Sequence, residues 1–322
     1  MSIQSELQAA IKAVLPDVSC VIGWGKGPDA LHGAPLFMRA AEDVDGLEAG
    51  FFSVNNPALY LPEYKGTKIA VVVKGCDSRS VGQLVAEGLI KREEVVIIGF
   101  PCNGVLDNDK VAAALVGKVE AGEVLGALET DDELVLNFPK QEVRLKKADI
   151  IADKCKRCLF PNSLIADTFV GEPRKASIDQ DSYEDLAAFE ALSLEERQAF
   201  WNKEMSRCIR CYACRNACPL CVCRDHCVAT SRNPEWVTQA DGVTDKLFFQ
   251  IIHASHLSGR CTGCGECQRA CPENIPVLLF KRSMTRKVED LFAYRTGVDI
   301  EGKPPLLTFN VEEPTIKERD WK

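Results

Sequence analysis

Long apolar runs and an excess of basic charge are both missing from this 322-residue sequence. No apolar stretch approaches the roughly 20 residues that a membrane-spanning helix needs. Lys and Arg number 39 against 47 Asp and Glu, which gives a net charge of −8. Such a balance is not typical of a nucleic-acid binder. We therefore expect neither membrane insertion nor nucleic-acid binding.

A secretory signal and a nucleophilic catalytic arrangement are missing as well. Charges interrupt residues 1–15, so this segment predicts an amphipathic helix rather than a signal peptide. The four histidines form no Ser-His-Asp or Cys-His pattern typical of covalent catalysis. We expect a cytoplasmic protein without a catalytic nucleophile of this kind.

Cysteine, by contrast, is abundant. Of the 16 cysteines, eleven lie between Cys208 and Cys271, and three lie within the first 150 residues. In a reducing compartment, thiols stay free unless a metal binds them. The composition therefore predicts metal or cluster chemistry that is concentrated in the C-terminal half.

The N-terminal half has the pattern of an α/β domain. Residues 68–74 and 94–99 are two β-branched runs typical of strands that are buried on both faces. Between them, apolar residues at helical spacing predict a helix that Asp77 or Ser78 caps. Strand, helix and strand in this order predict a parallel sheet. Residues 134–145 differ, because two short apolar runs flank a turn and predict an antiparallel hairpin.

The sequence divides into four predicted parts. The fold class is an α/β N-terminal domain with a mainly parallel sheet, followed by an α+β two-cluster ferredoxin-like domain. The predicted boundaries are 1–170 for the α/β domain, 171–204 for a linker and a long helix over 186–205, 205–285 for the ferredoxin domain with a Cys-rich insertion, and 286–322 for a C-terminal arm.

One cysteine spacing occurs twice in the C-terminal half. Residues 208–219 and 261–272 each read C-x2-C-x2-C-x3-C-P, the spacing of bacterial two-cluster ferredoxins. The first three cysteines of a run bind one 4Fe-4S cluster, and the fourth binds the other cluster. The spacing assigns the first cluster to Cys208, Cys211, Cys214 and Cys271. It assigns the second cluster to Cys261, Cys264, Cys267 and Cys218. Structural zinc and disulfides are the alternatives, but zinc favours two C-x2-C pairs and disulfides need an oxidising compartment.

A second set of cysteines lies in the N-terminal half. Cys76 and Cys102 follow the two predicted buried strands, and Cys155 and Cys158 form a lone C-x2-C pair. Loops at the carboxyl ends of neighbouring parallel strands meet in one crevice, where α/β proteins usually bind ligands. We therefore expect these four thiols to hold a third 4Fe-4S cluster. Buried structural cysteines are the alternative, and zinc is a weaker one.

A third set lies in the insertion between the two ferredoxin runs. Cys221, Cys223 and Cys227 predict a further cluster or a zinc ion, with His226 or Cys20 as the fourth ligand. Passive thiols are the alternative.

Segments around the N-terminal cysteines resemble a known family. They are Lys74-Gly-Cys76, Gly99-Phe-Pro-Cys102, Asp153-Lys-Cys155-Lys-Arg-Cys158 and Ala166-Asp-Thr-Phe-Val-Gly171. Together they resemble the coenzyme F-420 hydrogenase/dehydrogenase beta-subunit family over about residues 65–175. In that family the ferredoxin-like cysteines usually precede the α/β region, whereas here they follow it. This order suggests a formate dehydrogenase or hydrogenase beta-subunit-like relative rather than a true deazaflavin reductase.

The resemblance implies a flavin, usually FAD, beside a cluster in the α/β domain. Residues 23–27 and 75–79 contain glycines after predicted strands, where backbone amides could hold phosphate. Neither segment matches the G-x-G-x-x-G fingerprint, and short glycine loops are usually turns. The side chains expected to contact phosphate are Lys74, Arg79, Lys154 and Arg157, with ordinary surface charge as the alternative.

These features together predict an iron–sulfur electron-transfer subunit of a cytoplasmic multi-subunit oxidoreductase in anaerobic metabolism. The 4Fe-4S clusters would relay electrons to or from a flavin or a partner, and the cofactors would supply the chemistry. One alternative is a flavin-dependent subunit that exchanges hydride with NAD(P)H or a deazaflavin; another is a cluster-bearing scaffold. The expected partners are a heterodisulfide-reductase-like flavoprotein, a hydrogenase, a formate dehydrogenase or a methylenetetrahydrofolate reductase.

Overall fold

A mainly parallel five-stranded sheet forms the centre of the N-terminal half. The computed structural model describes residues 2–119, 123–223, 227, 238 and 240–309. The strands are β1 (Val21–Lys26), β2 (Gly33–Met38), β3 (Ile69–Val73), β4 (Val95–Gly99) and β8 (Thr168–Phe169). Their order is β2-β1-β3-β4-β8, in which β2 is antiparallel to β1 and the remaining pairs are parallel. The predicted α/β class is confirmed.

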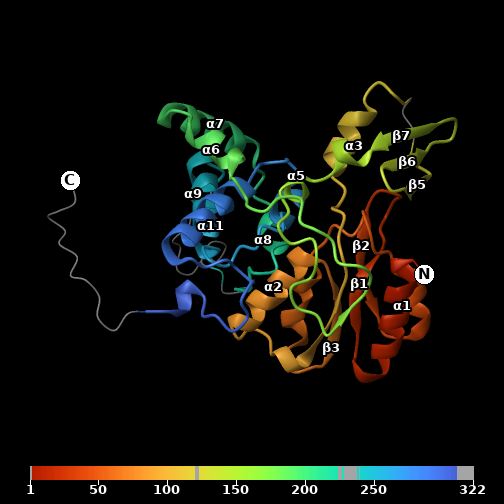
Figure 1. Ribbon diagram of the computed structural model, residues 1–322. Helices are drawn as coiled ribbons and strands as arrows, with labels where there is room; N and C mark the ends of the chain where they lie inside the picture. The colour runs from red at the N-terminus through yellow and green to blue at the C-terminus, as the bar shows by residue number, and fades with distance from the viewer. Residues whose placement is uncertain (1, 120–122, 224–226, 228–237, 239, 310–322) are drawn as a thin grey trace.

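Strand β3 is buried on both faces, as its continuous β-branched run predicts. Val71 and Val73 pack into one apolar cluster, whereas Ala70 and Val72 pack into another on the opposite face. Helix α1 (Ile3–Val14) covers the second face, and α2 (Gly75–Ala86) covers the first (Figure 1). Burial of each large aliphatic side chain contributes about 1.5–3 kcal/mol, so the two covered faces together fix the sheet.

The turn from β3 into α2 depends on Gly75. The helix begins at Gly75, two residues before the predicted caps, and Lys74 is its N-cap. The Lys74 backbone N–H donates to the Asp77 carboxylate over 3.2 Å. A Cβ on Gly75 would lie 1.8 Å from the Phe160 carbonyl oxygen. The missing side chain therefore lets the chain that carries Cys158 pack directly against the start of α2.

A second, antiparallel sheet extends the N-terminal half. It consists of β5 (Gly126–Glu129), β6 (Glu133–Asn137) and β7 (Glu142–Lys146), with β6 in the centre. The β6–β7 pair confirms the predicted hairpin, and β5 adds a third strand to it. The neighbouring helices are α3 (Asn108–Leu115), α4 (Lys147–Ile150) and α5 (Asp153–Lys156).

The long helix predicted over 186–205 is wrong. The structure has two helices there, α6 (Glu184–Glu190) and α7 (Leu194–Arg207). Ser193 starts the second helix, because its hydroxyl accepts the Glu196 N–H over 3.1 Å while the Glu196 carboxylate accepts the Ser193 N–H over 2.8 Å. This capping box satisfies backbone groups that a continuous helix would have paired internally.

The cysteine-rich half packs on the α2 face of the sheet. Its helices are α8 (Ala213–Asn216), α9 (Val243–His256), α10 (Glu266–Arg269) and α11 (Leu278–Phe292). The helices of this half lie beside α2 (Figure 1). Leu220 and Leu257 join the apolar cluster beneath α2, and Arg260 pairs with Glu87 over 2.6 Å. The two halves therefore share a buried interface.

The predicted linker and the predicted C-terminal arm can be compared with the helices of the structure. Residues 171–183 contain no helix or strand, which matches a connecting segment. Helix α11 crosses the predicted start of the arm at residue 286, so any arm begins after Phe292. Residues 310–322 of that arm lie outside the described residues. In the part of the chain that the structure describes, no helix has the length and apolar character to cross a membrane.

Gly75→Ala should destabilise the protein, because its new Cβ would collide with the Phe160 carbonyl. Overpacking of this kind costs about 1–3 kcal/mol. We expect the melting temperature to fall by about 2–4 °C for each kcal/mol. Gly126→Ala is the matched control, since its Cβ would meet the Asn137 side chain at an ordinary 3.6 Å. Equal melting temperatures for the two variants would contradict this account of the turn.

Candidate metal centres

The thiols of the first ferredoxin run meet the last thiol of the second run. A small cavity of about 20 Å³ is lined by Cys208, Cys211, Cys214 and Cys271. Burial raises the pKa of Cys214, and the charges of Cys271 and Cys208 add to the increase. This grouping, here named the first group, has the crossed membership that the spacing predicts.

The remaining four thiols form a second group. Burial raises the pKa of Cys218 well above its ordinary value, and the charges of three thiols from the other run add to the increase. Those three thiols are Cys261, Cys264 and Cys267. The pKa of Cys267 is raised to about 12, mainly by burial. The charge of Cys214, which belongs to the first group, adds to this increase. The two groups are therefore neighbours.

The chemistry of both groups fits iron–sulfur clusters. Their shell is apolar, since Cys214 and Cys267 pack with Phe249, Ile275 and Val277. Four thiols in such a shell are the donor set that 4Fe-4S clusters use. Among the described residues, no set of three or more His, Cys, Asp or Glu side chains is arranged to hold a single metal ion. On the strength of their four thiols and apolar shell, the two groups are candidate sites for clusters, in which each thiolate binds a different iron.

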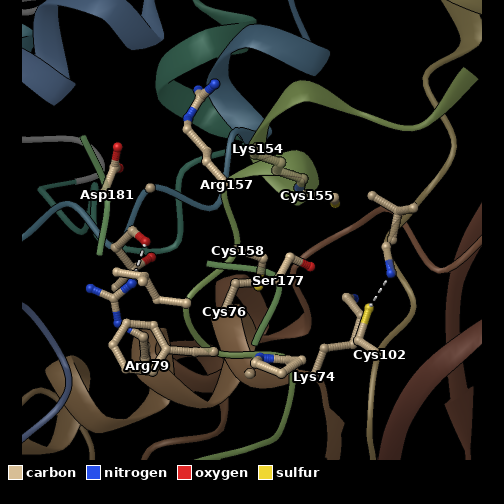
Figure 2. Close-up of a pocket in the computed structure, with 18 of the residues that line it drawn as sticks. Lys74, Cys76, Arg79, Cys102, Lys154, Cys155, Arg157, Cys158, Ser177 and Asp181 are labelled. Atoms are coloured by element: carbon tan, nitrogen blue, oxygen red, sulfur yellow. Dashed lines mark hydrogen bonds between the residues drawn. The ribbon is translucent and has the colours of Figure 1, made fainter. Parts of the chain in front are cut away.

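A third group of thiols lies in a cavity of about 240 Å³ between the two halves. Figure 2 shows Cys76 at the start of α2, Cys102 after β4, Cys155 in α5 and Cys158 beyond the end of α5. Burial raises the pKa of Cys102 to about 12, with Lys74 opposing and Cys155 adding to the increase. The parallel-strand argument thus brings these four cysteines to one cavity, here named the crevice.

The four predicted phosphate-binding cations line the same crevice, but protein groups already engage them. Lys74 is buried, pairs with Asp77 over 2.7 Å, and lies 3.9 Å from the Trp24 ring centre. Arg157 lies 3.6 Å from Asp185. The role of these cations toward a phosphate stays a prediction.

The other two cations connect the crevice with the second group. Arg79 donates to the Thr262 carbonyl over 3.0 Å and to the Thr296 carbonyl over 2.7 Å. Lys154 donates to the Cys264 carbonyl. Burial opposes the charge of Lys154, but the Cys76 thiolate and other neighbours hold its pKa above the ordinary value. Cys261 itself lines the crevice, so the second group and the crevice share a wall.

Sequence reasoning missed several charged groups of the crevice. Arg174 and Lys175 line its exposed side, although they come from the predicted linker. The linker is fixed there, because Asn162 exchanges hydrogen bonds of 2.7 and 2.9 Å with the Arg174 backbone. The composition of this segment gives no such signal. The sequence predicts Asp77 as a helix cap, but it does not reveal the buried ion pair between Asp77 and Lys74.

The insertion thiols form a looser group. Burial raises the pKa of Cys221 to about 11, and the charges of Cys223 and Cys227 add to the increase. Cys20 lies elsewhere: it is fully buried, and its neighbours include Tyr64 and Arg39. His226, the other suggested ligand, lies outside the described residues.

Residues 23–27 do not form the expected phosphate loop. They lie mostly within β1, where Gly25 pairs with Ala34 of β2. The glycines allow close packing rather than a turn, since a Cβ on Gly25 would lie 3.0 Å from the Gly46 carbonyl oxygen. Residues 75–79 do begin a helix after a strand, but the Asp77 carboxylate already accepts the N–H at that helix start.

Part of the chain matches a known domain family, and nearly the whole chain has curated relatives. A family model described as "4Fe-4S dicluster domain" matches residues 204–275. The F420-dependent formate dehydrogenase subunit beta of Methanocaldococcus jannaschii is 26% identical over 92% of this chain and 90% of its own length. The F420-dependent formate dehydrogenase 1 subunit beta of Methanococcus maripaludis is 25% identical over 90% of this chain and 89% of its own.

A solved structure is also similar in part. It is a chain of the F420-reducing [NiFe] hydrogenase complex from Methanosarcina barkeri, with a TM-score of 0.38 and 15% identity. The match covers 49% of this chain and 62% of that chain, which is less than two thirds of its length. The curated relatives and the dicluster domain confirm the resemblance to the coenzyme F-420 hydrogenase/dehydrogenase beta-subunit family and the presence of a 4Fe-4S domain.

Lys74→Met should strongly destabilise the protein, because it leaves the buried Asp77 carboxylate without its partner. Breaking such a pair costs about 3–5 kcal/mol, whereas replacing both partners with apolar groups is often neutral. We therefore expect Lys74→Met/Asp77→Leu to recover most of the loss in a denaturant titration. Lys91→Met is the control, since the exposed Lys91–Glu94 pair contributes at most about 1 kcal/mol. A Lys74→Met variant as stable as Lys91→Met would refute the buried pair.

Proposed function

We propose that this chain is the iron–sulfur electron-transfer subunit of a multi-subunit cytoplasmic oxidoreductase. The observation that carries the proposal is the shared wall between the crevice and the second group, which Arg79 and Lys154 form. The curated relatives, both beta subunits of formate dehydrogenases, support the same conclusion.

Each thiol group is proposed to hold one 4Fe-4S cluster. The first group supplies Cys208, Cys211, Cys214 and Cys271. The second group supplies Cys218, Cys261, Cys264 and Cys267. The crevice supplies Cys76, Cys102, Cys155 and Cys158. When bound, such clusters supply one-electron carriers whose potentials respond to nearby charge and hydrogen bonds. Cys221, Cys223 and Cys227 would contribute ligands to a further cluster.

The order of the groups supports a linear relay. The first and second groups are neighbours through Cys214 and Cys267. The second group and the crevice are neighbours through Lys154, because the charges of Cys76, Cys155 and Cys264 all raise the pKa of its ammonium. The protein positions the three groups, excludes water with an apolar shell, and provides cations that offset the charge of the thiolates.

We further propose that FAD binds at the exposed side of the crevice. The relatives are named for dependence on F420, a deazaflavin, and exchange of electron pairs with one-electron carriers needs a group that can do both. Arg174 and Lys175 line the crevice on its exposed side, where they could bind phosphate. The catalytic partner would be a formate dehydrogenase or a hydrogenase; a heterodisulfide-reductase-like flavoprotein and a methylenetetrahydrofolate reductase are the other candidates.

Cys102→Ser should lower the iron content of anaerobically purified protein by about four atoms per chain, because one 4Fe-4S cluster loses a ligand. The matched control is Cys20→Ser, since Cys20 is also a buried thiol but belongs to none of the groups. Iron and acid-labile sulfide, measured per chain, check the result. Unchanged iron in Cys102→Ser would exclude a cluster in the crevice, while wild-type protein without iron would exclude the whole proposal.

Reversing charge at the exposed side of the crevice should weaken flavin binding. In Arg174→Glu/Lys175→Glu, each lost charge-assisted contact would cost about 1.5–3 kcal/mol, so FAD affinity should fall at least about tenfold. Fluorescence titration of the protein with FAD measures the effect. Arg144→Glu on β7 is the control, because Arg144 is exposed and lies on the other sheet. Equal FAD affinity in all three proteins would contradict the proposed flavin site.

A further inference from the structure

Helix α11 carries a lysine in an unusual place. Lys281 is 1% exposed, yet its Nζ has no hydrogen-bond partner. Burying an ammonium without compensation is costly, so such a group normally pairs or becomes neutral. Lys281 is therefore either neutral or stabilised by charges that are not its hydrogen-bond partners.

The neighbours of Lys281 are thiols from both ferredoxin groups. Helix α11 packs against α9 (Figure 1), and Leu278 shares an apolar cluster with Cys214 and Cys267. Burial acts to lower the pKa of Lys281, but the charges of Cys267 and Cys214 outweigh this effect and raise it. Cys261 and Cys218 act in the same direction. One of these thiols belongs to the first group and three belong to the second.

Other buried cations of this half are paired with carboxylates. Lys246 on α9 pairs with Asp241 over 2.7 Å. Arg282, the residue after Lys281, pairs with Asp181 and Asp185, each over 2.7 Å. Within the described residues, no such ion pair or hydrogen bond includes the Lys281 ammonium. Its charge is therefore free to act on the thiol groups.

We propose that Lys281 raises the reduction potentials of both ferredoxin clusters by placing one uncompensated positive charge between them. This inference rests on the proposed function, in which the two groups hold clusters. Adding an electron makes a thiolate-bound cluster more negative, and a nearby cation in a poorly polar interior favours that reduced form. A single residue thereby couples the potentials of two consecutive carriers.

Gln250 gives an internal comparison. It is 2% exposed on α9, and its amide Nε2 donates to the Cys214 sulfur over 3.7 Å. An N–H donor to a cluster ligand also raises the potential, but this contact reaches only the first group. The two side chains therefore predict different patterns: Lys281 affects both clusters, whereas Gln250 affects one.

The test is a redox titration, monitored by electron paramagnetic resonance, of the anaerobically purified full chain and its variants. Lys281→Met should shift the oxidised-to-reduced ratio of both ferredoxin clusters at least tenfold toward oxidised at a fixed potential, about 59 mV for a one-electron couple. Lys281→Arg, which keeps the charge, should stay near wild type. Lys287→Met is the matched control, because Lys287 is exposed on the same helix and solvent screens its charge. Gln250→Leu should shift one cluster only.

The outcomes separate this inference from the proposed function. Wild-type protein without two ferredoxin signals would overturn the proposed function itself. Intact signals at wild-type potentials in Lys281→Met would overturn the inference alone. Loss of iron in Lys281→Met with full iron in Lys281→Arg would support it, because the thiolates would then need the charge to hold their clusters. Loss of iron in both variants would overturn it in favour of a packing role.

Discussion

The structure depends on cations that offset the negative charge of thiolates in a poorly polar interior. The three groups of four thiols are mostly half-buried, with Cys214 and Cys267 buried and Cys211 exposed. Desolvation disfavours the charged forms of Cys102, Cys214 and Cys218. Cations accompany each place where groups meet: Lys154 lies between the crevice and the second group, and Lys281 lies between the second and first groups. Such cations favour the thiolate forms, which are the forms that bind metal.

The same requirement explains how the two halves are joined. Arg79 on α2 bonds to the carbonyls of Thr262 and Thr296, and Glu87 on the same helix pairs with Arg260. These contacts use side chains of the N-terminal half to fix loops of the C-terminal half. The interface is thus also the boundary between two thiol groups, so the same residues fix the fold and line the proposed path for electrons.

Much of this arrangement follows from sequence spacing. The ferredoxin runs are local patterns, so the membership of the first and second groups could be predicted from the cysteines alone. Predicting the crevice takes one more rule, that loops at the carboxyl ends of neighbouring parallel strands meet. This rule places Cys76 and Cys102 together, as the structure does. Whether these thiols bind clusters stays a prediction.

The partners of the buried cations are not predictable from the sequence. The partners of Lys74, Arg79 and Lys154 lie on other elements or depend on the fold, and Lys281 sits in an ordinary amphipathic pattern that gives no sign of burial without a carboxylate. The helix break at Ser193 was missed because apolar periodicity outweighed a capping box that the sequence does contain.

Magnetic coupling tests the central claim most directly. If three clusters occupy neighbouring groups, fully reduced protein should give split or broadened paramagnetic resonance signals, because adjacent reduced clusters act on one another. Partial reduction should simplify the spectrum as isolated spins appear. Sharp, independent signals at full reduction, or no iron-dependent signal at all, would contradict a continuous relay through this chain.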